Sequence, residues 1–370
     1  MKKHNYFIIL ISSLFLIISC NQQNTKWQGT IEETDGVTVV KNPKEPMYEE
    51  DILQLEEDLS IGTKEGNEDY MFSQIRGVAV DNNENIYVLD NREANIKKYD
   101  KHGLHVKTIG RRGQGPGEMV SCYSILISPQ DEIVVSDAAS RRLTFFNLEG
   151  EYLRMLSMAQ NLLIFPKMDN QGHFYSIIPT SDEKGLKIEY QKFSPELEYL
   201  MSVVSVHSRR HSQTEKYHPF RPSLVDAVTR NDLIVCGYPD LYEVGFYDTQ
   251  GILTKKIFKE YDPVNISEKV LTEIQQQRTS LEYSLELSRH YPPYFTFFVD
   301  DKNKIFVGTY EKFDNKNIYD VFDEESRFIT RIPLNPFPLI MKKDQLYSLE
   351  EDEEGYQLVK RYKVTWKIEE

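Results

Sequence analysis

One stretch of the chain repeats itself after 47 residues, and this repeat constrains the fold more than any other feature. Residues 78–103 align without a gap with residues 125–150. The matched pairs include Val78 with Ile125, Asp90 with Asp137, and Gly103 with Gly150. Each copy reads as four short apolar strands separated by polar turns. Four short strands in 40–50 residues predict one blade of a β-propeller.

The turn between the first two strands of the first copy resembles half of a calcium loop. Asp81–Asn85 carries side-chain oxygens at the spacing of the first calcium ligands. A calcium loop would need Gly at its sixth position and Glu at its twelfth, where Ile86 and Arg92 stand instead. In the second copy, Ser128–Glu132 keeps the flanking apolar runs but not the oxygen ligands. We therefore predict a hairpin turn and no metal site here.

Weaker copies of the pattern continue toward the C-terminus. They occupy residues 172–206, 232–258, 303–332 and 337–366. The last copy supplies only three strands, and Ile52–Ile61 has the right character to add the fourth. Such an addition would close the ring and remove the exposed strand edges of an open sheet. Six blades closed by an N-terminal strand are therefore expected.

The predicted fold is all-β, a six-bladed propeller over residues 51–368 with one helical insert at about 262–290, between blades four and five. Ser267 is expected to cap this helix, and Glu268 lies in its first turn. One face of the helix is apolar, formed by Val270, Ile274, Leu281 and Leu285.

The sequence of the first repeat unit resembles the NHL repeat. Residues 77–118 show its G-V-A-V-D start, its I-Y-V-x-D second strand, an aromatic-Asp pair and a Gly-rich exit. More closely, the chain resembles the six-bladed β-propeller lipoproteins of Bacteroidota, with NHL-like or TolB-like blades, which carry the leader seen at Gly36–Pro46. The resemblance is specific in blades one and two and weak beyond them. It implies a fold and a location, because most members of that family have no assigned activity.

The N-terminus reads as an export signal. Two lysines precede the apolar run Tyr6–Ile18, which is too short to span a bilayer comfortably. The ending IISC resembles the lipobox of bacterial lipoproteins, so we expect removal of residues 1–19, acylation of Cys20, and a tether and leader over residues 20–50. An ordinary signal peptide is the alternative. No acidic cluster follows Cys20, which favours the periplasmic side of the outer membrane over the cell surface.

Charge and motifs exclude several classes of function. A formal net charge of -14 argues against binding nucleic acid. Cys122 and Cys236 are expected to be buried free thiols, and not a disulfide. No G-x-S-x-G, H-E-x-x-H or C-x-x-C motif occurs, and three histidines in one loop lack a fourth zinc ligand. No metal or cofactor is expected.

The candidate binding residues are arginines in the connections of an otherwise acidic protein. In a propeller, the blade-to-blade connections share one face with the turns between second and third strands. Three arginine pairs fall there: Arg111 and Arg112, Arg141 and Arg142, and Arg209 and Arg210. Guanidinium groups bind carboxylate, sulfate or phosphate in a bidentate manner, which predicts an anionic ligand such as an acidic glycan, or a partner protein. The alternative is a solvated rim paired with nearby carboxylates.

Two functions compete. The first is a membrane-anchored binding or scaffold module, attached through lipid on Cys20. The second is a metal-dependent NHL-like enzyme of the lyase or lactonase type, which would need several carboxylate, Asn or His side chains converging on the axis. The sequence offers no such set. Asp90 and Asp137 are repeat-equivalent, which predicts turn capping and no catalytic pair.

Overall fold

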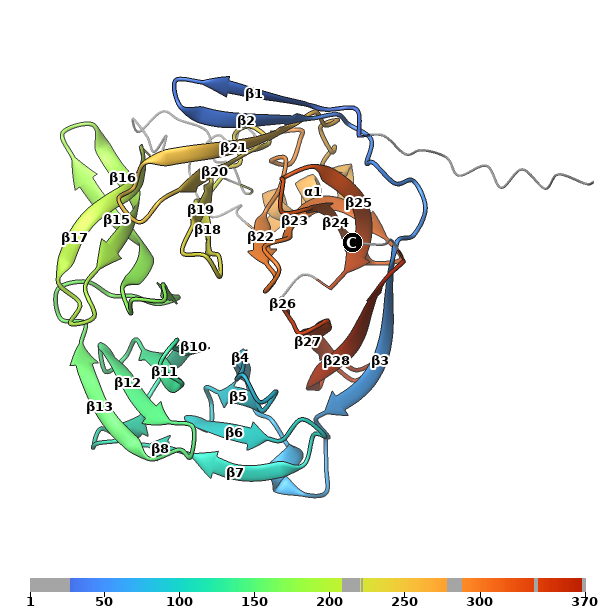
Figure 1. The fold of residues 1–370 in the computed structure, drawn as a ribbon. Helices are drawn as coiled ribbons and strands as arrows, with labels where there is room; N and C mark the ends of the chain where they lie inside the picture. Colours follow the sequence, from blue (N-terminus) through green and yellow to red (C-terminus); the bar gives the residue numbers. More distant parts are fainter. Residues whose placement is uncertain (1–26, 208–219, 221, 278–287, 336–338, 368–370) are drawn as a thin grey trace, which may run out of the picture.

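Six β-sheets surround a central axis in the computed structural model (Figure 1). The structure describes residues 27–207, 220, 222–277, 288–335 and 339–367. Every sheet contains four antiparallel strands that run in order from the axis to the rim. The predicted all-β six-bladed propeller is confirmed.

In blades 1 to 3 the four strands of each blade follow one another in the chain. They are β4 (Ile75–Val80), β5 (Ile86–Asp90), β6 (Asn95–Tyr99) and β7 (His105–Ile109); β10 (Cys122–Ile127), β11 (Glu132–Asp137), β12 (Arg142–Asn147) and β13 (Tyr152–Ser157); and β14 (Lys167–Met168), β15 (Phe174–Asp182), β16 (Gly185–Phe193) and β17 (Tyr199–His207). A 3-10 turn, η1 (Glu68–Tyr70), precedes blade 1, and a short parallel ribbon of β8 (Arg111–Arg112) and β9 (Glu118–Met119) joins blades 1 and 2.

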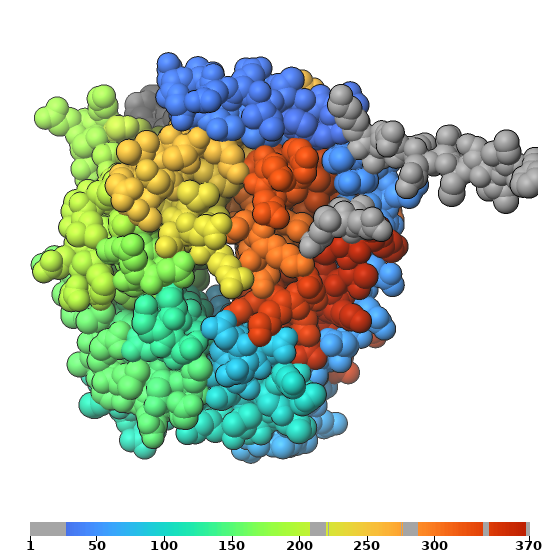
Figure 2. Space-filling view, viewed as in Figure 1, coloured from blue at the N-terminus to red at the C-terminus, as the bar shows by residue number. Residues whose placement is uncertain are grey.

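Blades 4 to 6 complete the ring. Their strands are β18 (Val225–Val228), β19 (Ile234–Gly237), β20 (Glu243–Tyr247) and β21 (Leu253–Lys259); β22 (Thr296–Val299), β23 (Ile305–Phe313), β24 (Lys316–Phe322) and β25 (Phe328–Leu334); and β26 (Leu339–Lys342), β27 (Gln345–Glu351), β28 (Gln357–Trp366) and β3 (Leu53–Ile61). Figure 2 shows the blades packed around a small central hollow.

The turn at Asp81 is a hairpin, as predicted. It joins β4 and β5, and the backbone N–H groups of Asn83 and Asn85 donate to Asp81 Oδ1 at 2.8 and 2.9 Å. Later blades begin the same turn with an oxygen acceptor for a backbone N–H: Ser128, Asp169, Thr229 and Asp300. These oxygens therefore hold the turn together.

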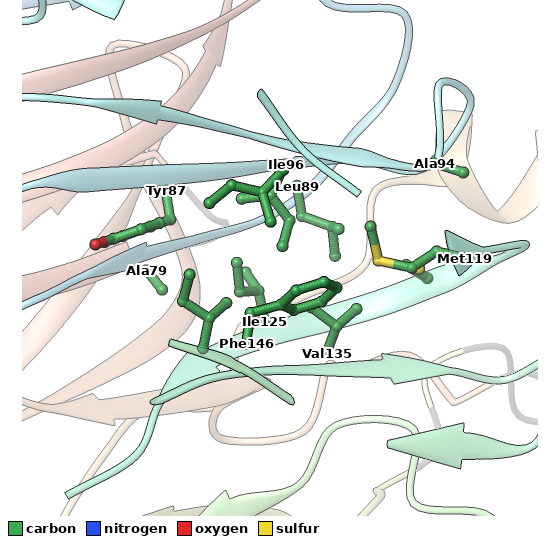
Figure 3. Close-up of a cluster of buried hydrophobic side chains, with 12 residues drawn as sticks. Ala79, Tyr87, Leu89, Ala94, Ile96, Met119, Ile125, Val135 and Phe146 are labelled. Atoms are coloured by element: carbon green, nitrogen blue, oxygen red, sulfur yellow. The ribbon is translucent and has the colours of Figure 1, made fainter. Parts of the chain in front are cut away.

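The core lies between neighbouring blades. Between blades 1 and 2, Tyr87 and Leu89 of β5 pack with Val135 of β11 and Phe146 of β12, all at most 1% exposed (Figure 3). Because the inner strands are covered on both faces, their sequences contain unbroken apolar runs, such as Ile133–Val135 in β11. The two described cysteines, Cys122 and Cys236, are free and buried, as expected.

The ring closes as predicted. Strand β3 pairs antiparallel with β28, from Leu53 opposite Trp366 to Ile61 opposite Val359. The two strands carry opposite charges. Lys360 Nζ lies 3.0 Å from Glu57 Oε2, and Arg361 forms a bidentate pair with Asp58 at 2.9 and 3.0 Å.

The leader contains a β-hairpin that the sequence interpretation did not anticipate. Strands β1 (Thr30–Thr34) and β2 (Val37–Asn42) pair with each other, and β2 then adds parallel to β21. Blade 4 is therefore extended to six strands (Figure 1). Asn42 is 2% exposed; its Oδ1 accepts from Phe328 N at 2.7 Å and its Nδ2 donates to Ser326 O at 3.0 Å. The leader thus ties blade 4 to blade 5.

The helical insert between blades 4 and 5 is confirmed as α1 (Glu268–Gln277). Val270 N lies 3.4 Å from the Ser267 hydroxyl, which is the capping contact that the sequence predicts. The expected apolar positions Leu281 and Leu285 lie outside the described residues. In the part of the chain that the structure describes, no helix combines the length and the apolar character needed to cross a bilayer.

Candidate functional site

The inner strand of each blade begins on one face of the ring, called here the connection face. This face also carries the turns between second and third strands. Arg111 and Arg112 lie in the connection between blades 1 and 2, and Arg141 and Arg142 in the corresponding turn of blade 2. The fold therefore brings these four arginines to one side of the ring. Arg209 and Arg210 lie outside the described residues.

The four arginines have partners within the protein. Arg111 pairs with Glu118 Oε1 at 2.8 Å, although its side chain is 81% exposed. Arg112 donates to Val120 O at 3.1 Å, and also to Arg92 O. Arg141 donates to Met158 O and Ala159 O at 3.1 and 3.0 Å. A bound anion would have to compete with these contacts.

Arg142 is the clearest case of a structural arginine. Its side chain is buried, and it donates to Gln114 O at 2.9 Å and to Glu118 O at 2.6 Å. Both acceptors belong to the connection between blades 1 and 2, so Arg142 holds that connection against blade 2. These contacts resemble the predicted rim more than a free anion site. Ligand binding by the four arginines stays a prediction.

Asp90 and Asp137 cap turns, as the repeat predicted. Asp90 accepts from Ser73 N at 2.6 Å and Gln74 N at 3.1 Å. Asp137 accepts from Val120 N at 2.9 Å and Ser121 N at 3.0 Å. Each carboxylate ends the second strand of a blade and binds the backbone that leads into the first strand of the same blade. The two residues perform the same structural task in neighbouring repeats.

A different set of side chains lines the start of the inner strands of blades 1 to 3. Arg76 and Tyr123 are repeat-equivalent, and each lies at a β-bulge, between Ile75 and Gly77 or between Cys122 and Ser124. Bulges redirect a side chain out of the regular alternation of a strand. The Arg76 guanidinium carbon lies 5.8 Å from the centre of the Tyr123 ring.

Phe165 extends this arrangement to blade 3. Its ring centre lies 6.4 Å from that of Tyr123, at an interplanar angle of 78°, and the residue is 57% exposed. Arg76, Tyr123 and Phe165 therefore form a row across three blades, called here the mouth row. Within the described part of the chain, Arg76 is exposed and makes no hydrogen bond or ion pair, in contrast to the predicted arginines.

Sequence reasoning missed Arg76 because it searched the connections, and Arg76 stands inside a strand. One signal was available: the repeat places a long polar side chain and an aromatic ring at matched positions of otherwise apolar inner strands. The bulge that turns both side chains outward has no sequence signature of its own.

Blades 4 and 5 contribute aromatic rings to the connection face. Tyr291 stacks on Tyr310 with ring centres 4.3 Å apart, and Phe220 packs against Tyr291 at 4.6 Å. Burial raises the pKa of Tyr310 to about 12, so the phenol is neutral. Burial also raises the pKa of Asp226 in β18, which the nearby charge of Lys167 partly offsets. These rings form a second aromatic cluster on the connection face, separate from the mouth row.

The candidate metal ligands of the sequence were the histidines of one loop. Across the described ranges, no three His, Cys, Asp or Glu side chains lie close enough together to hold a metal ion. His207, the described member of the three-histidine loop, contacts Asp182 Oδ2 at 2.8 Å. The other two histidines of that loop lie outside the described residues.

The fold and this face define a β-propeller with a basic and aromatic surface where its inner strands begin. The family model DUF5128, described as a 6-bladed beta-propeller, matches residues 59–356 of the chain. The chain therefore belongs to this family. No curated protein sequence matches the chain significantly.

Solved structures share the fold at low sequence identity. A Bacteroides fragilis protein named as exported is 13% identical, with a TM-score of 0.53 over 90% of this chain and 100% of its own. A DUF4221 family member from Bacteroides vulgatus is 11% identical, with a TM-score of 0.52 over 85% of this chain and 99% of its own. A gluconolactonase from Xanthomonas campestris is 11% identical, with a TM-score of 0.46 over 79% of this chain and 86% of its own, and is too distant to inform the chemistry here.

Proposed function

We propose that this protein is a lipid-anchored, exported binding module whose mouth row holds an acidic glycan. The observation that carries this proposal is Arg76, whose exposed guanidinium has no hydrogen-bond or ion-pair partner among the described residues. It lies near the ring of Tyr123, which in turn contacts the exposed ring of Phe165. A guanidinium fork fits a carboxylate with two parallel hydrogen bonds. Aromatic faces pack against the C–H faces of sugar rings. A uronic acid joined to further sugars would use both.

The charge of the protein supports recognition at short range. The net charge of -14 repels an anion at a distance, but at physiological salt charges are screened beyond about 8 Å. An acidic glycan would therefore be held by direct contact with Arg76. We expect little electrostatic steering and an association rate that depends weakly on salt.

The anchoring part of the proposal rests on the N-terminal sequence. A basic start, a short apolar run and the ending IISC support export followed by acylation of Cys20. Outer-membrane attachment on the periplasmic side and an NHL-like origin of the blades belong to the same proposal.

Calorimetry with defined oligosaccharides tests the binding site. Wild-type protein should bind an oligomer of uronic acids and not its neutral counterpart. Arg76→Gln should weaken binding by about 10- to 100-fold, because a hydrogen bond to a charged group contributes about 1.5–3 kcal/mol. The matched control is Arg230→Gln, an exposed arginine in a turn between first and second strands, on the opposite face. It should leave binding unchanged.

Equal binding by wild type and Arg76→Gln would contradict the assignment of Arg76. If no acidic oligosaccharide binds to the wild-type protein, the proposal of an acidic glycan as the ligand is wrong. Arg111→Ser with Arg112→Ser tests whether the site extends to the connection between blades 1 and 2. The enzyme alternative, a metal-dependent lyase or lactonase, is tested by metal analysis of the purified protein.

A further inference from the structure

The described chain begins at a fixed point on the rim of the ring. Trp27 Nε1 donates to Asn42 Oδ1 at 3.0 Å. Asn42 is itself held by blade 5 through Phe328 N and by blade 4 through Glu260 N, which donates to Asn42 O at 3.1 Å. In Figure 1 the leader hairpin lies along the outer edge of blade 4, beside blade 5. The chain therefore enters the fold at the rim of blades 4 and 5.

The link from this point to the proposed acylation site is short. Cys20 precedes Trp27 by seven residues, which span at most about 25 Å when fully extended. A folded domain of this length is about 50 Å across. The tether is thus shorter than the body that it holds, so the body cannot turn every part of its rim toward the membrane.

We infer that the rim of blades 4 and 5 faces the lipid surface and that the rim of blades 1 to 3 faces away from it. This inference rests on the proposed acylation of Cys20. The strand edge that the leader covers, along β21, lies on the membrane side. The outer strands of blades 1 to 3 have no added strand, and their exposed apolar side chains cannot reach the membrane that holds the anchor. These side chains are Leu104, Val106, Leu153, Met155, Tyr199 and Leu200.

Energy transfer from two matched positions to the membrane tests this orientation. Glu325 and Glu149 occupy the same position in the turn between third and fourth strands, in blades 5 and 2, which lie opposite each other across the ring. Both are exposed, while the native Cys122 and Cys236 are buried. The acylated full-length protein carrying Glu325→Cys or Glu149→Cys is labelled with a donor dye. It is then bound to phosphatidylethanolamine–phosphatidylglycerol vesicles that contain a headgroup acceptor, with the unsubstituted protein as labelling background.

Transfer from the Glu325→Cys dye should exceed transfer from the Glu149→Cys dye. Insertion of a long Gly/Ser linker between residues 26 and 27 should abolish the difference, because the tether then exceeds the size of the body. Equal or reversed transfer in acylated protein would overturn the orientation alone. Mass spectrometry separates the two proposals: absence of a diacylglyceryl group on Cys20 would overturn the anchoring, and its presence with greater transfer from the Glu325→Cys dye supports both.

Discussion

At the scale of single residues, short side-chain acceptors organise the hairpins of this protein. The turn between first and second strands is capped in blades 1 to 5. The turn between third and fourth strands has such an acceptor in blades 1 to 5: Asp100, Asn147, Ser194, Asp248 and Asp323. In blade 6, Asp352 plays the same part in the turn between the second and third strands. The acceptor receives N–H groups two or four residues later, which is the local bond that Asx and Ser/Thr turns provide.

Asp300 provides a test of this role, because burial raises its pKa from 3.8 to about 6. The folded protein then binds this proton more tightly than the unfolded chain, so stability falls as pH rises from about 4 to about 6. The rise corresponds to at most about 3 kcal/mol at 1.36 kcal/mol per pH unit. Asp300→Asn keeps the acceptor for Lys302 N and Lys304 N but does not ionise.

Urea unfolding should therefore show the Asp300→Asn variant gaining stability over wild type between about pH 4 and about pH 7. Asp248→Asn, which accepts the same pair of N–H bonds in a less buried turn, is the control and should show a smaller change. A constant difference between Asp300→Asn and wild type across this range would contradict the prediction.

The sequence predicted these turns, but it did not reveal which side chains accept their hydrogen bonds. Ser128 seemed to break an oxygen pattern, yet its hydroxyl accepts the backbone bonds that Asp81 accepts in blade 1. The partners of the arginines could not be predicted for another reason. Arg112 and Arg142 donate to backbone carbonyls of other segments, and residue spacing does not reveal such partners. Side-chain type could be read from the sequence, but long-range partners could not.

At the scale of elements, the leader hairpin is the main feature that sequence reasoning missed. A signal existed in Asp35-Gly36 between two β-prone runs, which is the strongest short hairpin signal. Both residues have positive φ, 51° and 77°, as such a turn requires. The parallel pairing of β2 with β21, more than 200 residues later in the chain, has no comparable signature.

Asn42→Ala tests whether the leader stabilises the ring. The substitution would leave Phe328 N and Ser326 O without their buried partners, at a cost of about 1–3 kcal/mol. We expect a matching decrease in the free energy of unfolding, measured with urea. Lys41→Ala removes only an exposed ion pair with Glu32 of the paired strand β1 and should cost less than about 1 kcal/mol. Equal effects of the two substitutions would argue against a clamping role for Asn42.

At the scale of the whole molecule, the ring is defined by repetition and by one pairing between distant segments. The number of blades and the closing strand could be predicted because each blade repeats the same pattern of apolar strands and polar turns. The mouth row could not be predicted from the sequence, because it depends on β-bulges and on the way neighbouring blades face one another. At the closing pair, β3 and β28 carry opposite charges, including Asp58 with Arg361.

Charge reversal tests the closure. Arg361 is 8% exposed and also donates to Lys101 O of blade 1 at 2.7 Å, so Arg361→Asp should cost about 3–5 kcal/mol. Adding Asp58→Arg should recover part of this loss in thermal unfolding. The reversal of Glu132 and Arg154, an ion pair inside blade 2, should have a much smaller effect. Failure of Asp58→Arg to recover any stability would show that the pair does not guide closure.

The pairing of β3 with β28 also sets an order of events during synthesis. Ile61, at the end of β3, leaves the ribosome 296 residues before Gln357, at the start of β28. At 5–20 residues per second, this delay lasts roughly 15–60 s. An orphan strand is an aggregation hazard, and like charges on it discourage pairing with other copies. Glu56, Glu57 and Asp58 therefore act twice: they keep a nascent segment apart from other copies of the chain, and they later pair with a strand that carries the opposite charge.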